Sequence, residues 1–216
     1  LSYEKFRQIK FDKQLPAEMQ YPYKIDSMFL LDAAGYPSLS SLITNFKNWD
    51  KRGDVSSKGA AIFLLTYEHL KTKLMGQPSR KITKAEAVET FSYVNEYMQT
   101  NFGTTDLSLG DIQKLVRGKK EWPLWGFPDL LSPQWTEPYE KGKLKSIGGD
   151  GLIMFVRFQK NALPKIETIN MYGASARPGS RHFDDQVEMY LRQQTKTMTL
   201  DKAVVYKAAE SIYHPQ

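Results

Sequence analysis

Apolar side chains recur at helical spacing through the first half of the chain. Residues 38–50 place five of them on one face of a helix: Leu39, Leu42, Ile43, Phe46 and Trp49. Residues 56–76 are apolar around most of a helical circumference, and Gly76 follows as a stop signal. This pattern predicts an amphipathic helix followed by a longer helix in the centre of the fold.

Two further segments have helical patterns with recognisable ends. In residues 83–103, Thr83 and Glu86 have the spacing of a capping box, and the segment ends on a glycine. Residues 108–118 are shorter and also end on a glycine, so we expect a fourth helix there.

The pattern changes after residue 120. Residues 121–145 hold four prolines and three tryptophans without a clean period, which predicts an irregular segment held in place by large aromatic side chains. Residues 151–159 are nearly all apolar, and residues 165–173 alternate, so both are expected to be strands. Residues 161–164 should join them as a hairpin-like turn.

The chain ends with two expected helices, at 183–194 and 199–212. Helices first and a strand pair late indicate the α+β class. We divide the chain into a mainly helical lobe, residues 1–120, and a second part, residues 121–216, with the irregular segment, the strand pair and the C-terminal helices.

Composition is that of a soluble globular protein and excludes several chemistries. The 216 residues are 41% apolar, carry a net charge of +6 and contain no cysteine, which removes thiolate nucleophiles, zinc–thiolate sites and disulfides. The densest basic run, residues 117–120, is too short for a nucleic-acid arm. Apolar runs fall short of the roughly 20 residues of a membrane span, and the charged residues 1–6 do not resemble a signal peptide.

The turn at residues 173–190 contains the residue types of a nucleophilic triad, Ser180, His182 and Asp185. Triad members normally come from separate elements so that they can converge. Crowding in one turn favours a structural interpretation, in which Pro178 and Gly179 bend the chain and the acidic residues begin a helix. A metal site is not expected, because no second cluster of ligands accompanies the turn.

Other candidate groups have simple structural interpretations. His69 lies on the apolar helix and is expected to be a hydrogen-bonded packing residue, while His214 is close to a chain end. Residues 148–151, Gly-Gly-Asp-Gly, lack the lysine of a phosphate loop. The tryptophans of residues 117–145 could stack on single-stranded nucleic acid, but their acidic neighbours favour a buried loop.

Three segments in order resemble a known family: "LVRGKKEWPLWGFPDLL" (115–131), "IGGDGLIMFVRF" (147–158) and "IETINMYGASARPGSRHFDDQVEMYLRQQTKTMTLDKA" (166–203). Trp49 and Asp50, within residues 45–70, fit the same family. The matching turn positions are Tyr172, Gly173, Ser175, Pro178, Gly179, Ser180, His182, Asp185 and Gln186. The chain thus resembles the end of the β chain of the penicillin acylase family of N-terminal-nucleophile hydrolases, most closely the acyl-homoserine-lactone and aculeacin acylase branch.

The resemblance implies an αββα fold whose nucleophile is a serine exposed by autoproteolysis, with its own α-amine as general base. This chain begins with Leu1, and Ser2 lacks the family's nucleophile context. The resemblance therefore implies a C-terminal part of the β chain, without a nucleophile and inactive alone. Its partners would be the α chain, the rest of the β chain and a small acylated amide, in the periplasm or secreted, with no cofactor, metal, nucleic acid or membrane span.

One catalytic role carries over to this chain. Asp150 matches an acidic residue that helps orient the N-terminal amine and a neighbouring histidine in some acylases. The alternative is that Asp150 only shapes the turn after Gly148 and Gly149. At the level of function, the alternative is a non-catalytic domain, structural or binding an anionic polymer through residues 117–145.

Overall fold

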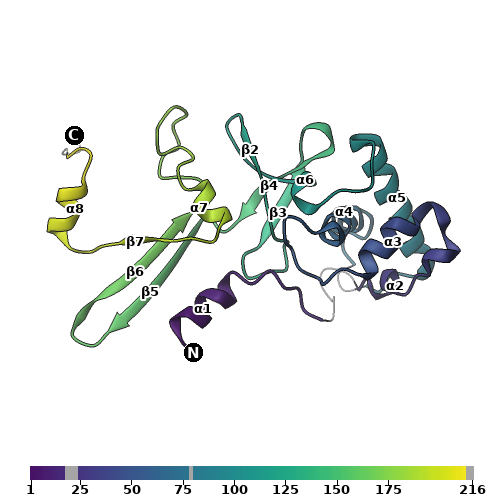
Figure 1. Ribbon diagram of the computed structural model, residues 1–216, viewed down its shortest axis with the longest axis horizontal. Helices are drawn as coiled ribbons and strands as arrows, with labels where there is room; N and C mark the ends of the chain where they lie inside the picture. The colour runs from purple at the N-terminus through teal and green to yellow at the C-terminus, as the bar shows by residue number, and fades with distance from the viewer. Residues whose placement is uncertain (18–23, 78–79, 213–216) are drawn as a thin grey trace. The chain divides into compact units, whose positions relative to one another are not determined.

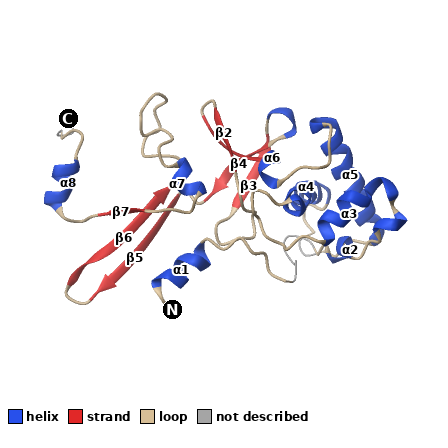
Figure 2. Ribbon diagram, in the orientation of Figure 1, coloured by secondary structure: helices blue, strands red, loops and turns tan. Residues whose placement is uncertain are grey.

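The computed structural model describes residues 1–17, 24–77 and 80–212. It forms two compact units, a larger one of Lys10–Gly149 and a smaller one of Leu1–Ile9 with Asp150–Gln216. Each unit combines helices with one β-sheet (Figure 2), so the expected α+β class is confirmed.

The larger unit begins with helices (Figure 1): α2 (Asp26–Phe29), α3 (Ser40–Lys47), α4 (Lys58–Lys73), α5 (Lys84–Phe102) and α6 (Leu109–Ile112), with short 3₁₀ turns η1 (Ala33–Gly35), η2 (Pro37–Leu39) and η3 (Glu140–Gly142). Ten of the sixteen residues of α4 are buried, which confirms the predicted central helix. The helix ends three residues before Gly76.

The predicted helix ends are formed by local hydrogen bonds. The Ser57 hydroxyl accepts from the backbone N–H of Ala60 at 3.1 Å and caps α4. Thr83 and Glu86 form the capping box of α5, and Gly103 ends that helix in the left-handed conformation at a φ of 70°. The capping box and the glycine end of α5 were predicted from the sequence, because their signals lie within a few residues of each end.

The capping box is expected to make stability fall at acidic pH. Hydrogen bonds from Arg80 and then from the Thr83 backbone lower the pKa of Glu86 from 4.5 to about 2. Because the folded pKa is the lower one, the stabilisation is complete above about pH 4.5 and is lost as the pH falls towards 2. Glu86→Gln keeps the capping box but removes the ion pair with Arg80, so it should cost about 0.5–1 kcal/mol at neutral pH and flatten this acid slope.

Urea unfolding across the acid range measures this effect. Glu96→Gln is the matched control, because Glu96 is an exposed residue of the same helix. An unchanged acid slope in Glu86→Gln would contradict the prediction.

Residues 113–149 form a four-stranded sheet in the order β2-β1-β4-β3. Its strands are β1 (Gln113–Arg117), β2 (Lys120–Pro123), β3 (Gln134–Pro138) and β4 (Leu144–Gly149). Only β1 and β4 run parallel. Of the irregular segment predicted at 121–145, residues 124–133 do lack helix and strand and bury Trp125, whereas β2, β3 and β4 were not predicted. Pro123 and Pro138 end their strands, where they interrupt no central ladder.

The helix expected at 108–118 was also largely wrong, because only α6 is helical. The buried side chain of Gln113 donates to the carbonyls of Leu124 at 3.1 Å and Gly126 at 3.0 Å. These bonds tie the chain to the segment after β2 and favour an extended β1. The sheet belongs to the same compact unit as α2–α6. The two units therefore divide after residue 149. The domain boundary expected between residues 120 and 121 lies at the start of β2.

The smaller unit is built on the predicted strand pair. Its elements are α1 (Tyr3–Lys10), β5 (Leu152–Gln159), β6 (Ala162–Asn170), α7 (Val187–Leu191), β7 (Lys196–Met198) and α8 (Lys202–Ala208). The sheet order is β5-β6-β7, all antiparallel. Gln159 pairs with Ala162, so the hairpin turn is tighter than the expected 161–164, and Asn161 takes a φ of 56° there.

The C-terminal helices are shorter than expected. The segment before Val187 is a turn, and Gln193 has a φ of 57°, which ends the helix expected at 183–194. The strand β7 was not predicted. Asp201 accepts hydrogen bonds from the backbone of Ala203 and Val204 and thereby caps α8.

The two faces of β5 differ. On one face, the ring of Phe155 lies edge-on to Tyr3 and Phe6 of α1, with ring centroids 6.2 and 5.8 Å away. The opposite face exposes a row of apolar side chains, which we call the β5 apolar face: Leu152, Met154, Val156 and Phe158.

Candidate functional site

Asp150 lies where the chain passes from the larger to the smaller unit. The preceding Gly149 has a φ of 149°, and a Cβ there would collide with the carbonyl oxygen of Pro133. The following Gly151 accepts a backbone hydrogen bond from Met171 at 3.2 Å. Asp150 is half-buried at the start of β5, the strand-edge position expected for it, and its catalytic role stays a prediction.

The turn after β6 is closed by hydrogen bonds. The backbone N–H of Ser175 donates to the carbonyl of His182 at 3.0 Å, and that of Gln186 donates to Tyr172 at 2.9 Å. The buried side chain of Gln186 accepts from the backbone of Asn170 at 3.1 Å. The turn therefore fastens the end of β6 to the start of α7.

The triad residue types of this turn are not arranged as a triad. The Ser180 hydroxyl accepts from the backbone N–H of His182 at 3.2 Å, and the imidazole faces carboxylates instead. Its Nδ1 lies 2.7 Å from Asp185 and its Nε2 lies 3.1 Å from Glu210. Gly179 has a φ of 88° at the bend, which agrees with the structural interpretation, but Asp184 and Asp185 lie before α7 and do not begin that helix as expected. Within residues 1–17, 24–77 and 80–212, no group of three or more acidic or histidine side chains is placed to hold a metal ion.

The tryptophans of the sheet region do not make one exposed stacking surface. Trp125 is 1% exposed, whereas Trp135 is 42% exposed. The nearby lysines are paired: Lys145 lies 2.9 Å from Glu137, and another ion pair joins Lys143 to Glu121. Burial of Trp125 and pairing of the lysines argue against a nucleic-acid platform, but the buried-loop interpretation fits Trp125 alone, because Trp135 lies exposed on β3.

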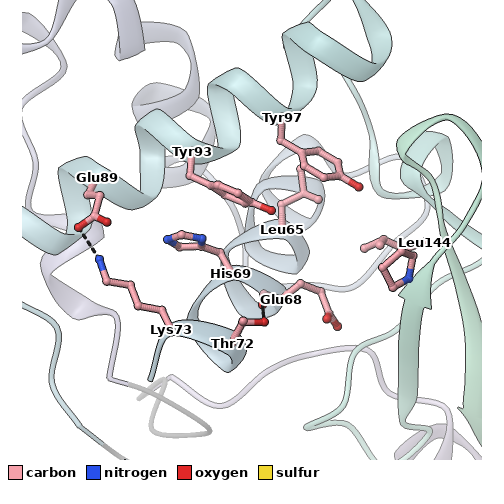
Figure 3. A pocket seen from close by; sticks show the side chains of 10 residues that line it. Leu65, Glu68, His69, Thr72, Lys73, Glu89, Tyr93, Tyr97 and Leu144 are labelled. Atoms are coloured by element: carbon pink, nitrogen blue, oxygen red, sulfur yellow. Dashed lines mark hydrogen bonds and ion pairs between the residues drawn. The ribbon is translucent and has the colours of Figure 1, made fainter. Parts of the chain in front are cut away.

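A cavity of about 570 Å³ lies between α4, α5 and the sheet of the larger unit (Figure 3). Tyr93 and Tyr97 project into it from α5, and Leu65 and Leu144 provide apolar surface. The Tyr93 ring stacks on His69 of α4, with ring centroids 4.0 Å apart and an angle of 23° between the planes. The tyrosines and His69 therefore form an aromatic wall.

His69 packs as expected but is not hydrogen-bonded as expected. Its Nε2 is buried and meets no hydrogen-bond partner within the described residues. Burial and then the nearby ammonium of Lys73 lower the pKa of His69, so the imidazole is neutral at physiological pH. A buried nitrogen without a partner is costly in a folded chain, which makes this position unusual. His214 lies outside the described residues.

Glu68 brings a negative charge into the same cavity. Its carboxylate accepts from the Thr136 hydroxyl at 3.0 Å and from Lys71 at 2.8 Å. Burial and then this carboxylate raise the pKa of Tyr93. At the other end, Lys73 and Glu89 form an ion pair (Figure 3).

Sequence patterns did not reveal this cavity. Glu68, His69 and Thr72 are polar positions on a helix interpreted as buried, and Tyr93 and Tyr97 are four residues apart on the next helix. These polar positions on one helix and the pair of tyrosines on the next were the only sequence signals for the cavity that we can identify. Their convergence depends on how α4 packs on α5.

The sequence and the structure were compared with protein families, curated proteins and solved structures. The family model described as penicillin amidase matches residues 1–207. Among solved structures, a thermostable penicillin G acylase from Alcaligenes faecalis is 13% identical, with a TM-score of 0.46, over 100% of this chain and 50% of that chain. This chain thus spans half the length of that acylase chain. No curated protein matches the sequence, and no helix in the described ranges combines the length and apolar character needed to cross a bilayer.

Proposed function

Because this chain belongs to the penicillin amidase family, we propose that it is the C-terminal part of the β chain of an N-terminal-serine acylase. The match of residues 1–207 to the family model carries this proposal. The whole enzyme would hydrolyse linear amide bonds, such as those of acyl-homoserine lactones, lipopeptides or β-lactam side chains. It would act in the periplasm or outside the cell.

In this proposal the catalytic groups are divided between segments. The serine nucleophile lies outside this chain, and its α-amine acts as general base because an α-amino pKa is close to neutrality. Asp150 accepts a hydrogen bond from that amine or from a neighbouring histidine and orients it. Gly149 and Gly151, through the close approach and backbone bond described above, hold Asp150 in place. The isolated chain is then inactive.

The β5 apolar face is the surface that we assign to the rest of the acylase. Leu152, Met154 and Val156 are 40–55% exposed, and β5 is an edge strand of the three-stranded sheet. An exposed apolar row on a sheet edge favours association with another segment. Its partners here are the α chain and the N-terminal part of the β chain.

The test compares this chain with a longer protein that carries it after a serine-initiated segment. Chromogenic anilides with acyl groups of graded length serve as substrates, and N-terminal sequencing identifies the exposed serine. We expect hydrolysis by the longer protein alone, and loss of hydrolysis when that serine is replaced by alanine. The proposal fails if the processed longer protein cleaves none of the anilides.

A further inference from the structure

We propose that the cavity between α4, α5 and the sheet of the larger unit binds a small organic cation with an apolar or planar body. This site is independent of the acylase proposal, because all its groups lie within Lys10–Gly149. We call it the α4–α5 cavity.

Size and shape fit a small molecule. The α4–α5 cavity measures about 570 Å³, within the range of ligand pockets in proteins. The stacked rings of His69 and Tyr93 and the adjacent ring of Tyr97, tilted by 39° to that of Tyr93, form one wall. Leu65 and Leu144 line it with apolar surface. A flat or apolar body can pack against this wall.

Charge selects a cation. The cavity is lined by two carboxylates, Glu68 and Glu89, and by one ammonium, Lys73, which Glu89 already neutralises. Glu68 is paired with Lys71, but Lys71 is not among the lining residues, so Glu68 is the lining carboxylate whose counter-ion lies outside the cavity lining. A carboxylate has about four lone-pair sites, and Glu68 uses two of them for Thr136 and Lys71. An anion would meet repulsion from Glu68, whereas a cation is attracted by it and by the aromatic faces.

His69 contributes its ring face and no charge. Its Nε2 is buried and has no hydrogen-bond partner in the described chain, so the ring, and not this nitrogen, is the surface that it offers in the aromatic wall. The neutral imidazole adds no repulsion against a cation. A primary ammonium carries three donors, which can reach the free lone-pair sites of Glu68.

Binding of three matched probes to the full 216-residue chain tests the proposal. Benzylamine is a cation, benzyl alcohol is neutral and benzoate is an anion, on the same ring. Calorimetric titration should give benzylamine a Kd at least about tenfold lower than either of the others. Equal affinity for all three, tighter binding of benzoate, or no binding of benzylamine would overturn the proposal.

Two variants with opposite expected effects locate the site. Glu68→Gln keeps an acceptor for Thr136 and should weaken benzylamine binding about tenfold, with benzyl alcohol unaffected. Lys73→Met releases Glu89 and should strengthen benzylamine binding severalfold. Glu96→Gln, an exposed charge change on α5, should have no effect.

Circular dichroism shows whether each variant is folded. If Glu68→Gln does not fold, the affinity of Lys73→Met for benzylamine tests the assignment of the site. The assignment would be overturned if Lys73→Met lowered the affinity for benzylamine. It would also be overturned if Glu96→Gln lowered that affinity as much as Glu68→Gln does. None of these readouts depends on amide hydrolysis.

Discussion

Replacing Trp49 with alanine is expected to lower the free energy of unfolding by about 3–5 kcal/mol. Trp49 is 7% exposed, and its ring centroid lies 5.7 Å from that of Phe46, 5.2 Å from Phe63 and 5.9 Å from Phe127. Its indole N–H donates to the carbonyl of Arg52 at 2.9 Å. Truncation leaves a cavity among aromatic rings that are held by three separate elements. Denaturant unfolding measures the loss.

Gly59 provides an internal check on this packing. A Cβ at Gly59 would collide with the Trp49 side chain, so Gly59→Ala should cost about 1–3 kcal/mol through overpacking. Alanine at position 49 would keep the Cβ that lies nearest to this site, so the check uses Trp49→Gly, which removes the whole side chain. In that background the collision is gone, so the double variant Trp49→Gly/Gly59→Ala should be more stable than the sum of its two single effects predicts. Gly35→Ala is the control, because nothing lies within 4 Å of its Cβ position. Additive effects would contradict this account of the core.

Replacing Asp150 with asparagine in the whole acylase is expected to lower kcat about a hundredfold, with little change in KM. Asparagine keeps the size and an acceptor oxygen but removes the charge. A nearby carboxylate raises the pKa of an ammonium group. Its loss should therefore lower the pKa of the α-amine, and the acidic limb of the pH–rate profile should move to lower pH. Steady-state kinetics across the pH range measure both effects.

Asp201→Asn is the control for this experiment. It makes the same substitution in the same unit, and asparagine caps helices as well as aspartate does. We expect no change in kcat or in the pH profile from it. If Asp150→Asn is equally silent, Asp150 only shapes the turn between β4 and β5.

Local signals predicted α3, α4, α5 and the strand pair, but not the bounds of the helices expected at 108–118, 183–194 and 199–212. The caps at Ser57, Thr83 and Asp201 and the left-handed end at Gly103 depend on bonds within a few residues. The alternation of the strand pair likewise reports one buried and one exposed face. The family resemblance followed from motif order, and the family-model match over residues 1–207 confirms the family, although not the branch.

The four-stranded sheet could not be predicted in the same way. Gln113 pairs with Leu144, some thirty positions later along the chain, in the parallel register of β1 and β4. Its strands have four to six residues, too few for a clean period among prolines and tryptophans. The apolar pattern at 108–118 is compatible with a helix. The extended conformation of β1 depends on the hydrogen bonds from Gln113 to the segment after β2.

The sequence by itself determined the α+β class, both ends of α5, the strand pair and the family. Tertiary structure decided which side chains share a surface. His69 was interpretable as a core residue from its helix alone, but the packing of α4 on α5 and the sheet places it beside Tyr93, in a cavity with Glu68. The physical reason is that caps and periodicity are set by neighbours along the chain. Cavities and their charge depend on distant segments brought together by burial of the core.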